Sequence, residues 1–263
     1  MLKFSPGSGN AKLQSLGGKV YTFSLPSGWS CPGADDCYSR AVSKDGKVAI
    51  VDGPNTKFRC FSASQEVVYT AVRQQRQYNF DLIKTTLKEG KVKALGALIQ
   101  GSLPKDATVI RIHVAGDFFS KAYLQAWIAV AVANPNIIFY AYTKSLHYWV
   151  ECIDFIPNNF KLNASKGGKF DHLIDAYHLK YAEVVFTEQE ALEKGLEIDH
   201  DDSHAFLKDN SFALLLHGVQ PKGSEAAEAL KLLKKAGIGQ YSKTKTNGTT
   251  IKKESKVLSS TEV

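Results

Sequence analysis

From Val109 onward, short apolar runs rich in β-branched residues alternate with longer segments whose apolar residues have helical spacing. The runs VIRIHV at 109–114, IIFYAY at 137–142 and AEVVF at 182–186 are typical of buried strands. Between the first two, Lys121 to Ala133 predicts a helix that Asn134-Pro135-Asn136 ends. Strands that alternate with helices indicate βαβ units and a parallel sheet. We therefore predict an α/β fold with mostly parallel strands, arranged as a partial or closed (β/α) barrel.

The rest of the chain supplies further elements of the same kinds. Lys19 to Leu25 alternates and predicts a strand before the first Gly/Pro-rich break. Thr187 predicts the start of a helix, because Glu190 stands three residues later as in a capping box. The remaining predicted strands are 47–51, 160–164, 196–199 and 212–217. The remaining predicted helices are 64–77, 80–88, 93–100, 145–152 and 224–236, with a helical turn at 170–179.

The composition of the chain indicates a globular domain followed by a basic tail. Apolar residues make up 44% and charged residues 22% of the 263 residues, which is typical of a globular chain. We predict a single α/β domain over residues 1–237. Residues 238–263 lack periodicity and carry five lysines and two glutamates, so they predict a mobile basic tail.

Charge and hydropathy narrow the class of partner. The tail contributes +3 of the net charge of +7, and the mild excess that remains permits a nucleotide or nucleic-acid partner without requiring one. No apolar run reaches the 18 or so residues of a membrane span, and the start of the chain lacks the apolar region of a signal peptide. We expect a cytoplasmic protein without a membrane partner, and the oligomeric state stays open.

Three of the four cysteines fall within thirty residues of one another. Cys31 and Cys37 flank a polar loop, and Cys60 follows after 22 intervening residues. Thiolates bind soft metals and iron–sulfur clusters, and three protein ligands leave one coordination position open. The spacing differs from the paired C-x2-C pattern of zinc sites. We predict a shared metal or cluster site, with structural zinc and ordinary thiols as alternatives. Cys152 lies in an amphipathic helix, where a thiol packs as a small apolar group.

Polar residues gather where the predicted strands end, the edge at which α/β folds form their sites. Gly116 would let a ligand approach the backbone, and Asp117 would bind a ligand amine or hydroxyl or cap the next helix. Lys144 would bind a phosphate or carboxylate or lie in solvent. His113, predicted to share a strand face with Arg111, is one candidate catalytic residue. The other candidates at this edge are Asn163 and Ser165 as binding residues and His217 as a catalytic residue.

The stretch Asp199-His200-Asp201-Asp202-Ser203-His204 has the residue types of a metal site, but such mixtures are more typical of solvated loops. A metal-dependent hydrolase that uses His113, Asp117, His200 and His217 is therefore a further alternative. No G-x-S-x-G, P-loop or G-x-G-x-x-G pattern occurs in the chain.

Several segments together carry a family resemblance: LPSGWSCPGADDC, RCFSASQE, RIHVAGDFFSKAYLQAW, FYAYTKS and LLLHGVQPKGS. Over roughly residues 8–237 they resemble the bacteriophage "gene product eighty-eight" domain proteins. The resemblance implies a phage protein that acts in the cytoplasm of the host cell.

A weaker resemblance is to radical S-adenosylmethionine enzymes and their phage-associated relatives. Cys37-Tyr38 looks like the end of their cysteine loop, and Gly116-Asp117 looks like the segment that contacts the methionyl amine. The cysteine spacing differs, since that superfamily has C-x3-C-x2-C. The resemblance implies an iron–sulfur cluster on Cys31, Cys37 and Cys60 with S-adenosylmethionine on its open iron. Asp117 would then orient the amine, and Asn163 and Ser165 would bind the ribose or carboxylate.

By analogy with the same relatives, the substrate would be a nucleotide or nucleic acid. The alternative is a non-catalytic phage protein that is stabilised by zinc and binds a host protein or nucleic acid.

Overall fold

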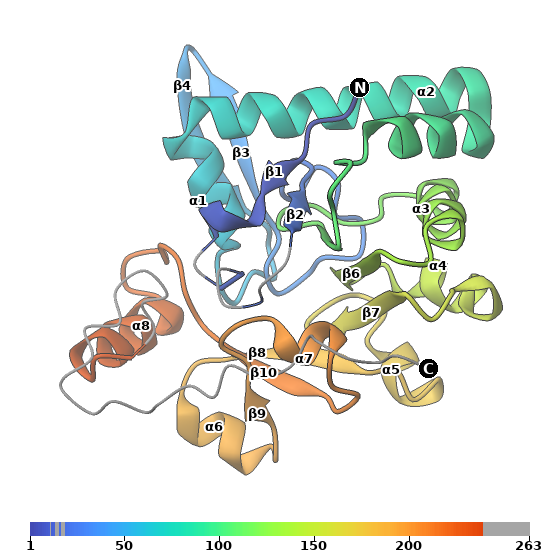
Figure 1. Cartoon of the computed structure of the whole chain (residues 1–263). Coiled ribbons are helices and arrows are strands. Elements are labelled where there is room, and N and C mark those ends of the chain that lie inside the picture. The colour runs from blue at the N-terminus through green and yellow to red at the C-terminus, as the bar shows by residue number, and fades with distance from the viewer. Residues whose placement is uncertain (11, 14–15, 17–18, 239–263) are drawn as a thin grey trace.

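A computed structural model of the chain describes residues 1–10, 12–13, 16 and 19–238. The predicted tail, 238–263, therefore lies outside the described residues except for Ile238. The described part is built around an eight-stranded sheet with the order β1-β2-β5-β6-β7-β8-β10-β9 (Figure 1). Its strands are β1 (Ser5–Pro6), β2 (Val20–Phe23), β5 (Val109–Ile112), β6 (Ile138–Thr143), β7 (Phe160–Ser165), β8 (Tyr181–Val185), β9 (Glu197–Ile198) and β10 (Phe212–Leu215). The strands β3 (Ser39–Lys44) and β4 (Lys47–Asp52) form a separate antiparallel hairpin.

The sheet is parallel from β2 to β9, and only β1 pairs antiparallel with its neighbour. Neighbouring strands follow one another along the chain from β2 to β8, and only β9 and β10 exchange places. Among the described strands, β1 and β9 form the two edges and do not pair with each other. The prediction of an α/β fold with mostly parallel strands is confirmed, and the sheet is open. All the parallel strands therefore end at one edge.

Helices fill the crossovers. The helices and 3-10 turns of the first half are η1 (Gly7–Gly9), α1 (Phe61–Val68), α2 (Thr70–Ser102), α3 (Lys121–Ala133), α4 (Leu146–Glu151) and η2 (Ile153–Phe155). Those of the second half are α5 (His172–Ala176), α6 (Glu188–Glu193), α7 (Ser203–Phe206) and α8 (Glu225–Lys235). The predicted cap of α6 is confirmed, because the Thr187 hydroxyl accepts a hydrogen bond from the Glu190 N–H. The backbone of Lys91, with φ of 55°, interrupts α2.

The main apolar core lies between the first half of the sheet and the helices α2, α3 and α4, which line the same side in Figure 1. Strand β6 shows how the alternation works. Phe139 and Ala141 pack into this core, whereas Tyr140 packs into a second cluster on the opposite face. That second cluster also contains Phe212 and Ala205 of α7. Both faces of the central strands are therefore covered.

The prediction of a solvated loop at 199–204 is wrong. Asp199 and Asp202 are buried, and Asp202 forms ion pairs with Arg111 and Lys12. The hydroxyl of Tyr140 also donates to Asp202, at 2.9 Å. The acidic segment is thus tied to the sheet through side chains that lie far away in the sequence. Along the described residues, no helix is both long enough and apolar enough to cross a membrane.

Candidate functional site

All three clustered cysteines lie in the long crossover between β2 and β5, which starts at the edge where the parallel strands end. Cys31 follows a tight turn and Cys37 leads into β3. Cys60 stands directly before α1, and its backbone N–H donates to the hydroxyl of buried Ser39 at 3.3 Å. This contact joins the start of α1 to the segment that carries Cys37.

The three thiols lie close enough to influence one another. Burial raises the pKa of Cys31 well above its usual value, and the charges of Asp117, Cys60 and Cys37 raise it further. Burial raises the pKa of Cys37 to about 11, although the nearby Lys144 ammonium lowers it in part. Burial likewise raises the pKa of Cys60, while hydrogen bonds from the N–H groups at the start of α1 lower it in part. The free thiols are therefore neutral near pH 7, and a bound cation would be needed to hold them as thiolates.

The loop between Cys31 and Cys37 is fixed to the ends of β6 and β7. The Asp36 N–H donates to the Gly167 carbonyl at 3.0 Å, and the Lys169 N–H donates to the Gly33 carbonyl at the same distance. A Cβ on Gly33 would lie 2.2 Å from the Lys144 carbonyl oxygen. Only glycine allows this approach, so the loop can lie flat over the sheet edge.

The segment before Cys60 is fixed to the end of β10. The side chain of Gln220 accepts the Arg59 N–H at 2.7 Å and donates to the Arg59 carbonyl at 3.2 Å. Chain segments that follow β2, β6, β7 and β10 thus meet around the cysteines. The site is built from strand ends that the sequence analysis identified, together with a glutamine that it did not.

Asp117 is 3% exposed and joins the ends of β5 and β6. Its carboxylate accepts the Thr143 hydroxyl, the Phe118 N–H at 2.7 Å and the Lys144 N–H at 2.8 Å. Burial raises its pKa to about 6, while these hydrogen bonds oppose the rise. The carboxylate does not cap α3, since Ser120 accepts the Tyr123 N–H there. Asp117 holds the turn that carries Lys144.

Lys144 is buried rather than solvated. Its ammonium donates to the carbonyl oxygens of Ser165, at 2.7 Å, and Lys166, at 2.5 Å. These bonds use two of the three N–H groups of the ammonium. The same positive charge acts on the thiol of Cys37. The Lys144 ammonium is therefore held between the end of β7 and the cysteines.

Gly116 is in close contact with two other segments of the chain. A Cβ on this residue would lie 2.5 Å from the Ser30 hydroxyl oxygen and 2.6 Å from the Leu25 Cβ. Its φ of 87° is also one that side chains rarely adopt. The absence of a side chain therefore lets residues 26–38, which we call the cysteine loop, pack against the end of β5. The sequence analysis had instead explained this glycine by the close approach of a ligand.

Asn163 and Ser165 lie on β7, two residues apart. The Asn163 amide donates to the carbonyls of Ala205, at 2.9 Å, and Ala141, at 3.3 Å. Its buried Oδ1 accepts no hydrogen bond from the described residues. Ser165 is partly exposed, and its carbonyl oxygen accepts from Lys144. Asn163 therefore keeps an acceptor oxygen that a ligand hydroxyl could use.

The prediction that His113 shares a face with Arg111 is wrong. β5 ends at Ile112, and His113 has a φ of 65°, so the strand alternation stops before it. The imidazole packs against Phe118 and hydrogen-bonds to the hydroxyl of Tyr123 at 2.9 Å. Burial lowers its pKa to about 3. These contacts place the imidazole in the apolar core, and its catalytic role stays a prediction.

His217 lies beside Phe61, the residue that follows Cys60. Its ring centroid lies 4.7 Å from that of Phe61. Its Nδ1 lies 3.1 Å from the Leu215 carbonyl oxygen, and burial lowers its pKa. His217 thus supports the start of α1.

The hydrolase alternative needs His113, Asp117, His200 and His217 around one ion. Within the described residues, no group of three or more His, Cys, Asp or Glu side chains is arranged to hold a single metal ion. Cys152, the fourth cysteine, is 2% exposed and packs in the main core, as predicted.

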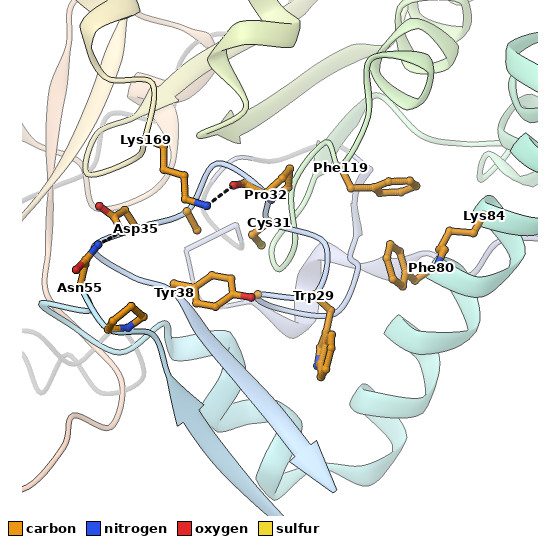
Figure 2. Close-up of a pocket in the computed structure, with 13 residues that line it drawn as sticks. Trp29, Cys31, Pro32, Asp35, Tyr38, Asn55, Phe80, Lys84, Phe119 and Lys169 are labelled. Atoms are coloured by element: carbon orange, nitrogen blue, oxygen red, sulfur yellow. Dashed lines mark hydrogen bonds between the residues drawn. The ribbon is translucent and has the colours of Figure 1, made fainter.

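An open cleft of about 590 Å³ lies beside Cys31, which forms part of its wall (Figure 2). Aromatic side chains from three segments surround it: Trp29 and Tyr38 from the cysteine loop, Phe80 from α2 and Phe119 from the β5–α3 turn. The sequence analysis missed this feature. The one local sign was the presence of Trp29 and Tyr38 within a Gly- and Pro-rich loop, where aromatic side chains have no core to enter.

A family model described as Gene product 88 matches residues 2–235. The "Gene 88 protein" of Mycobacterium phage L5 is 31% identical over 90 residues, which cover 32% of this chain and 38% of that relative. The match thus spans well under half of the length of the relative. No solved structure matches the chain.

Proposed function

The chain belongs to the gene product 88 family of phage proteins, and on this premise we propose that it is an iron–sulfur enzyme of the radical S-adenosylmethionine type. The observation that carries the proposal is the position of Cys31, Cys37 and Cys60 in one crossover, which starts where the parallel strands end and is fixed to the segments after β7 and β10. Four segments of the chain are fixed around these thiols by backbone hydrogen bonds and glutamine contacts.

We propose a cluster rather than a single ion. In a four-iron cluster each thiolate binds a different iron, so the sulfurs stand further apart than the ligands of one tetrahedral zinc. Within the described residues, no group of three or more His, Cys, Asp or Glu side chains is arranged to hold one metal ion, so the proposal depends on where the fold places the cysteines. With three protein thiolates, one iron is left open to a further ligand.

The order of the strands supports the same proposal. The parallel strands follow one another from β2 to β8 and the edges of the sheet do not meet, which is compatible with an incompletely closed (β/α) barrel. The cysteine loop follows β2, the first of the parallel strands, and Asp117 follows β5, the second. These are the positions that the resemblance to radical S-adenosylmethionine enzymes assigns to the cluster loop and to the segment that contacts the methionyl amine.

Cys31, Cys37 and Cys60 would hold the cluster, which would supply one-electron reduction of S-adenosylmethionine with the electron taken from an external reductant. The chain supplies the binding groups. A carboxylate would accept the third N–H of the Lys144 ammonium, and a ribose hydroxyl would donate to the Asn163 Oδ1, a buried atom that accepts no hydrogen bond from the described residues. Asp117 positions Lys144 through its backbone N–H.

The first experiment measures iron and acid-labile sulfide per chain after anaerobic purification. We expect a brown protein with broad absorbance near about 400 nm and an iron content that is lost in Cys31→Ala, Cys37→Ala and Cys60→Ala. Cys152→Ala is the matched control, because this thiol lies in the apolar core, and it should keep the iron. A colourless protein that contains zinc, or iron that survives in Cys31→Ala, contradicts the proposal.

A second experiment measures the binding of S-adenosylmethionine by equilibrium dialysis under anaerobic conditions. We expect binding to the iron-loaded protein and weaker binding to Lys144→Gln at equal iron content. The exposed lysine Lys231 provides the matched substitution Lys231→Gln, which should bind as the unmodified protein does. Equal affinity in the iron-loaded and iron-free proteins would contradict the assignment of the open iron.

A further inference from the structure

The cleft beside Cys31 is lined by four aromatic side chains, and its rim carries two lysines. Trp29, Tyr38, Phe80 and Phe119 supply the aromatic surface, and Lys84 and Lys169 supply the cations. We call this feature the aromatic cleft. Figure 2 shows Lys169 and Lys84 at opposite ends of the set, with Cys31 between them.

Trp29 is held in place and yet accessible. Its indole N–H donates to the Ala41 carbonyl of β3 at 3.2 Å, and the Arg40 guanidinium lies 4.6 Å from its ring centroid. The same guanidinium lies 5.3 Å from the ring of Tyr38. The side chain nevertheless remains 50% exposed. A large aromatic ring that is fixed from one side and open on the other is a preformed surface for stacking.

The second aromatic pair faces the cleft from another part of the fold. Phe80 and Phe119 meet edge to face, with ring centroids 5.1 Å apart. Phe119 also stacks on Tyr123 of α3, at 4.9 Å, which fixes its orientation. Rings from α2, the β5–α3 turn and the cysteine loop therefore border one space. A flat ligand fits such a space better than a bulky aliphatic one.

The charges of the aromatic cleft favour an anion. Lys84 lies over the ring of Phe80 at 5.2 Å, and Lys169 donates to the Pro32 carbonyl at 3.0 Å. In the part of the chain that the structure describes, neither lysine forms an ion pair with a carboxylate. Asp35 also lines the cleft and accepts a hydrogen bond from Asn55, and its negative charge leaves the lining with a net charge of +1. Both ends of the cleft therefore offer positive charge.

Flat aromatic surfaces between two cations match the chemistry of a nucleobase with its phosphate groups. A neutral sugar would use the rings but not the lysines, and an acidic peptide would use the lysines but not the rings. We propose that the aromatic cleft binds a nucleobase and its adjoining phosphates, from a single-stranded nucleic acid or a free nucleotide. Because Cys31 forms part of the wall, the bound base lies beside the cysteine site. Its role as the substrate rests on the proposed function, whereas binding itself does not require the cluster.

Fluorescence anisotropy of a labelled single-stranded oligonucleotide tests the proposal on the full chain, with unlabelled mononucleotides as competitors. We expect Trp29→Ala to weaken binding by about tenfold or more, and Trp29→Phe to restore most of the affinity, since stacking tolerates the change of ring. Phe155→Ala is the matched control, because Phe155 is 72% exposed and lies outside the aromatic cleft. Competition by a mononucleotide at equal affinity identifies the nucleotide as the source, and much tighter binding of the oligonucleotide identifies the strand.

The exposed Lys84 gives a second variant that leaves the fold intact. Lys84→Ala should weaken binding and reduce the dependence of the affinity on salt, whereas Lys231→Ala should change neither. Failure of both ligands to bind, or unchanged affinity in Trp29→Ala and Lys84→Ala, overturns the proposal. The iron content of each preparation separates the two proposals. A protein that binds the oligonucleotide without iron refutes only the cluster, and one that holds iron without binding either ligand refutes only the aromatic cleft.

Discussion

The carboxylate of Asp117 accepts the backbone N–H of Lys144 at 2.8 Å and so fixes the turn after β6 to the end of β5. The Lys144 side chain then reaches the end of β7, where it donates to the Ser165 carbonyl. Three successive strand ends are thus joined by one carboxylate and one ammonium beneath the cysteine loop. This relationship makes Asp117 a positioning residue for the candidate site.

Replacing Asp117 by asparagine tests this role. An amide can accept only on one side, so Asp117→Asn leaves one of the N–H donors facing another donor in a buried place. We expect the free energy of unfolding, measured by urea titration, to fall by about 1–3 kcal/mol, and the iron content to fall with it. The exposed Asp154 gives the control Asp154→Asn, which should change neither quantity. An unaltered iron content in a stably folded Asp117→Asn protein would remove Asp117 from the site.

His113 gives a prediction about pH. Burial lowers its pKa in the folded protein to about 3, below the ordinary value of 6.5. The unfolded chain therefore takes up a proton first as the pH falls below 6.5, and this histidine's contribution to stability is lost progressively between pH 6.5 and 3. We expect wild-type stability to fall by up to about 1.4 kcal/mol per pH unit more than that of His113→Asn, in urea titrations at pH 7, 6 and 5. Asparagine suits the left-handed backbone at this position.

His178 provides the control for that series. It is exposed and has a φ of 50°, so His178→Asn makes the same change in a similar backbone without emptying the core. Its pH dependence should match that of the wild type. If His113→Asn and the wild type lost stability in parallel from pH 7 to pH 5, the imidazole would not be held neutral by the core.

The ion pair between Arg111 and Asp202 predicts strong coupling. Both side chains are shielded from solvent, and Asp202 also accepts the Tyr140 hydroxyl. We expect Asp202→Asn alone to cost about 3–5 kcal/mol, because the buried Arg111 guanidinium loses the carboxylate with which it pairs. Arg111→Met alone should cost less, because Lys12 still pairs with Asp202. The double variant should be less unstable than the sum of the two, by about 2 kcal/mol in a double-mutant cycle. The exposed pair Lys121–Glu151 should show little coupling in the same analysis, and additive effects at Arg111 and Asp202 would contradict the prediction.

The sequence predicted the local elements better than the contacts between distant ones. Helix α3 has the predicted bounds, because Ser120 caps it and Asn134 ends it, and both signals lie within the helix's own segment. Strand β3 was missed, since SRAVSK carries few apolar residues and is stabilised by pairing with β4. The segment at 199–204 was misjudged because its partners Lys12 and Arg111 lie far away in the chain.

In the candidate site, too, features that follow from local sequence were predicted and features that depend on distant contacts were not. The closeness of Cys31, Cys37 and Asp117 follows from a strand order that the alternation of strands and helices already indicated. The position of His113 could not be predicted, because a single left-handed residue after Ile112 turns its side chain away from the face of Arg111. The aromatic cleft was also hidden, since Phe80 and Phe119 come from segments that meet Trp29 only in the fold.

The position of Gly116 predicts that its replacement by alanine lowers the free energy of unfolding through a clash with the cysteine loop. A methyl group at this position would lie 2.5 Å from the hydroxyl oxygen of Ser30, the residue before Cys31. It would also lie 2.6 Å from the Leu25 Cβ, which is fixed to the backbone and cannot rotate away. Gly223 has a similar φ of 81°, but a methyl group there would meet nothing within 4 Å. Gly223→Ala should therefore cost only the backbone strain of about 1–2 kcal/mol.

Gly116→Ala should cost about 2 kcal/mol more in urea titrations, since the loop must shift to make room. It should also lower the iron content, because a shift at Ser30 moves Cys31 relative to Cys37 and Cys60, whereas Gly223→Ala should keep the iron. Equal losses of stability in the two variants would mean that the end of β5 does not support the cysteine loop. The loop's position would then depend on its contacts with β6 and β7 alone.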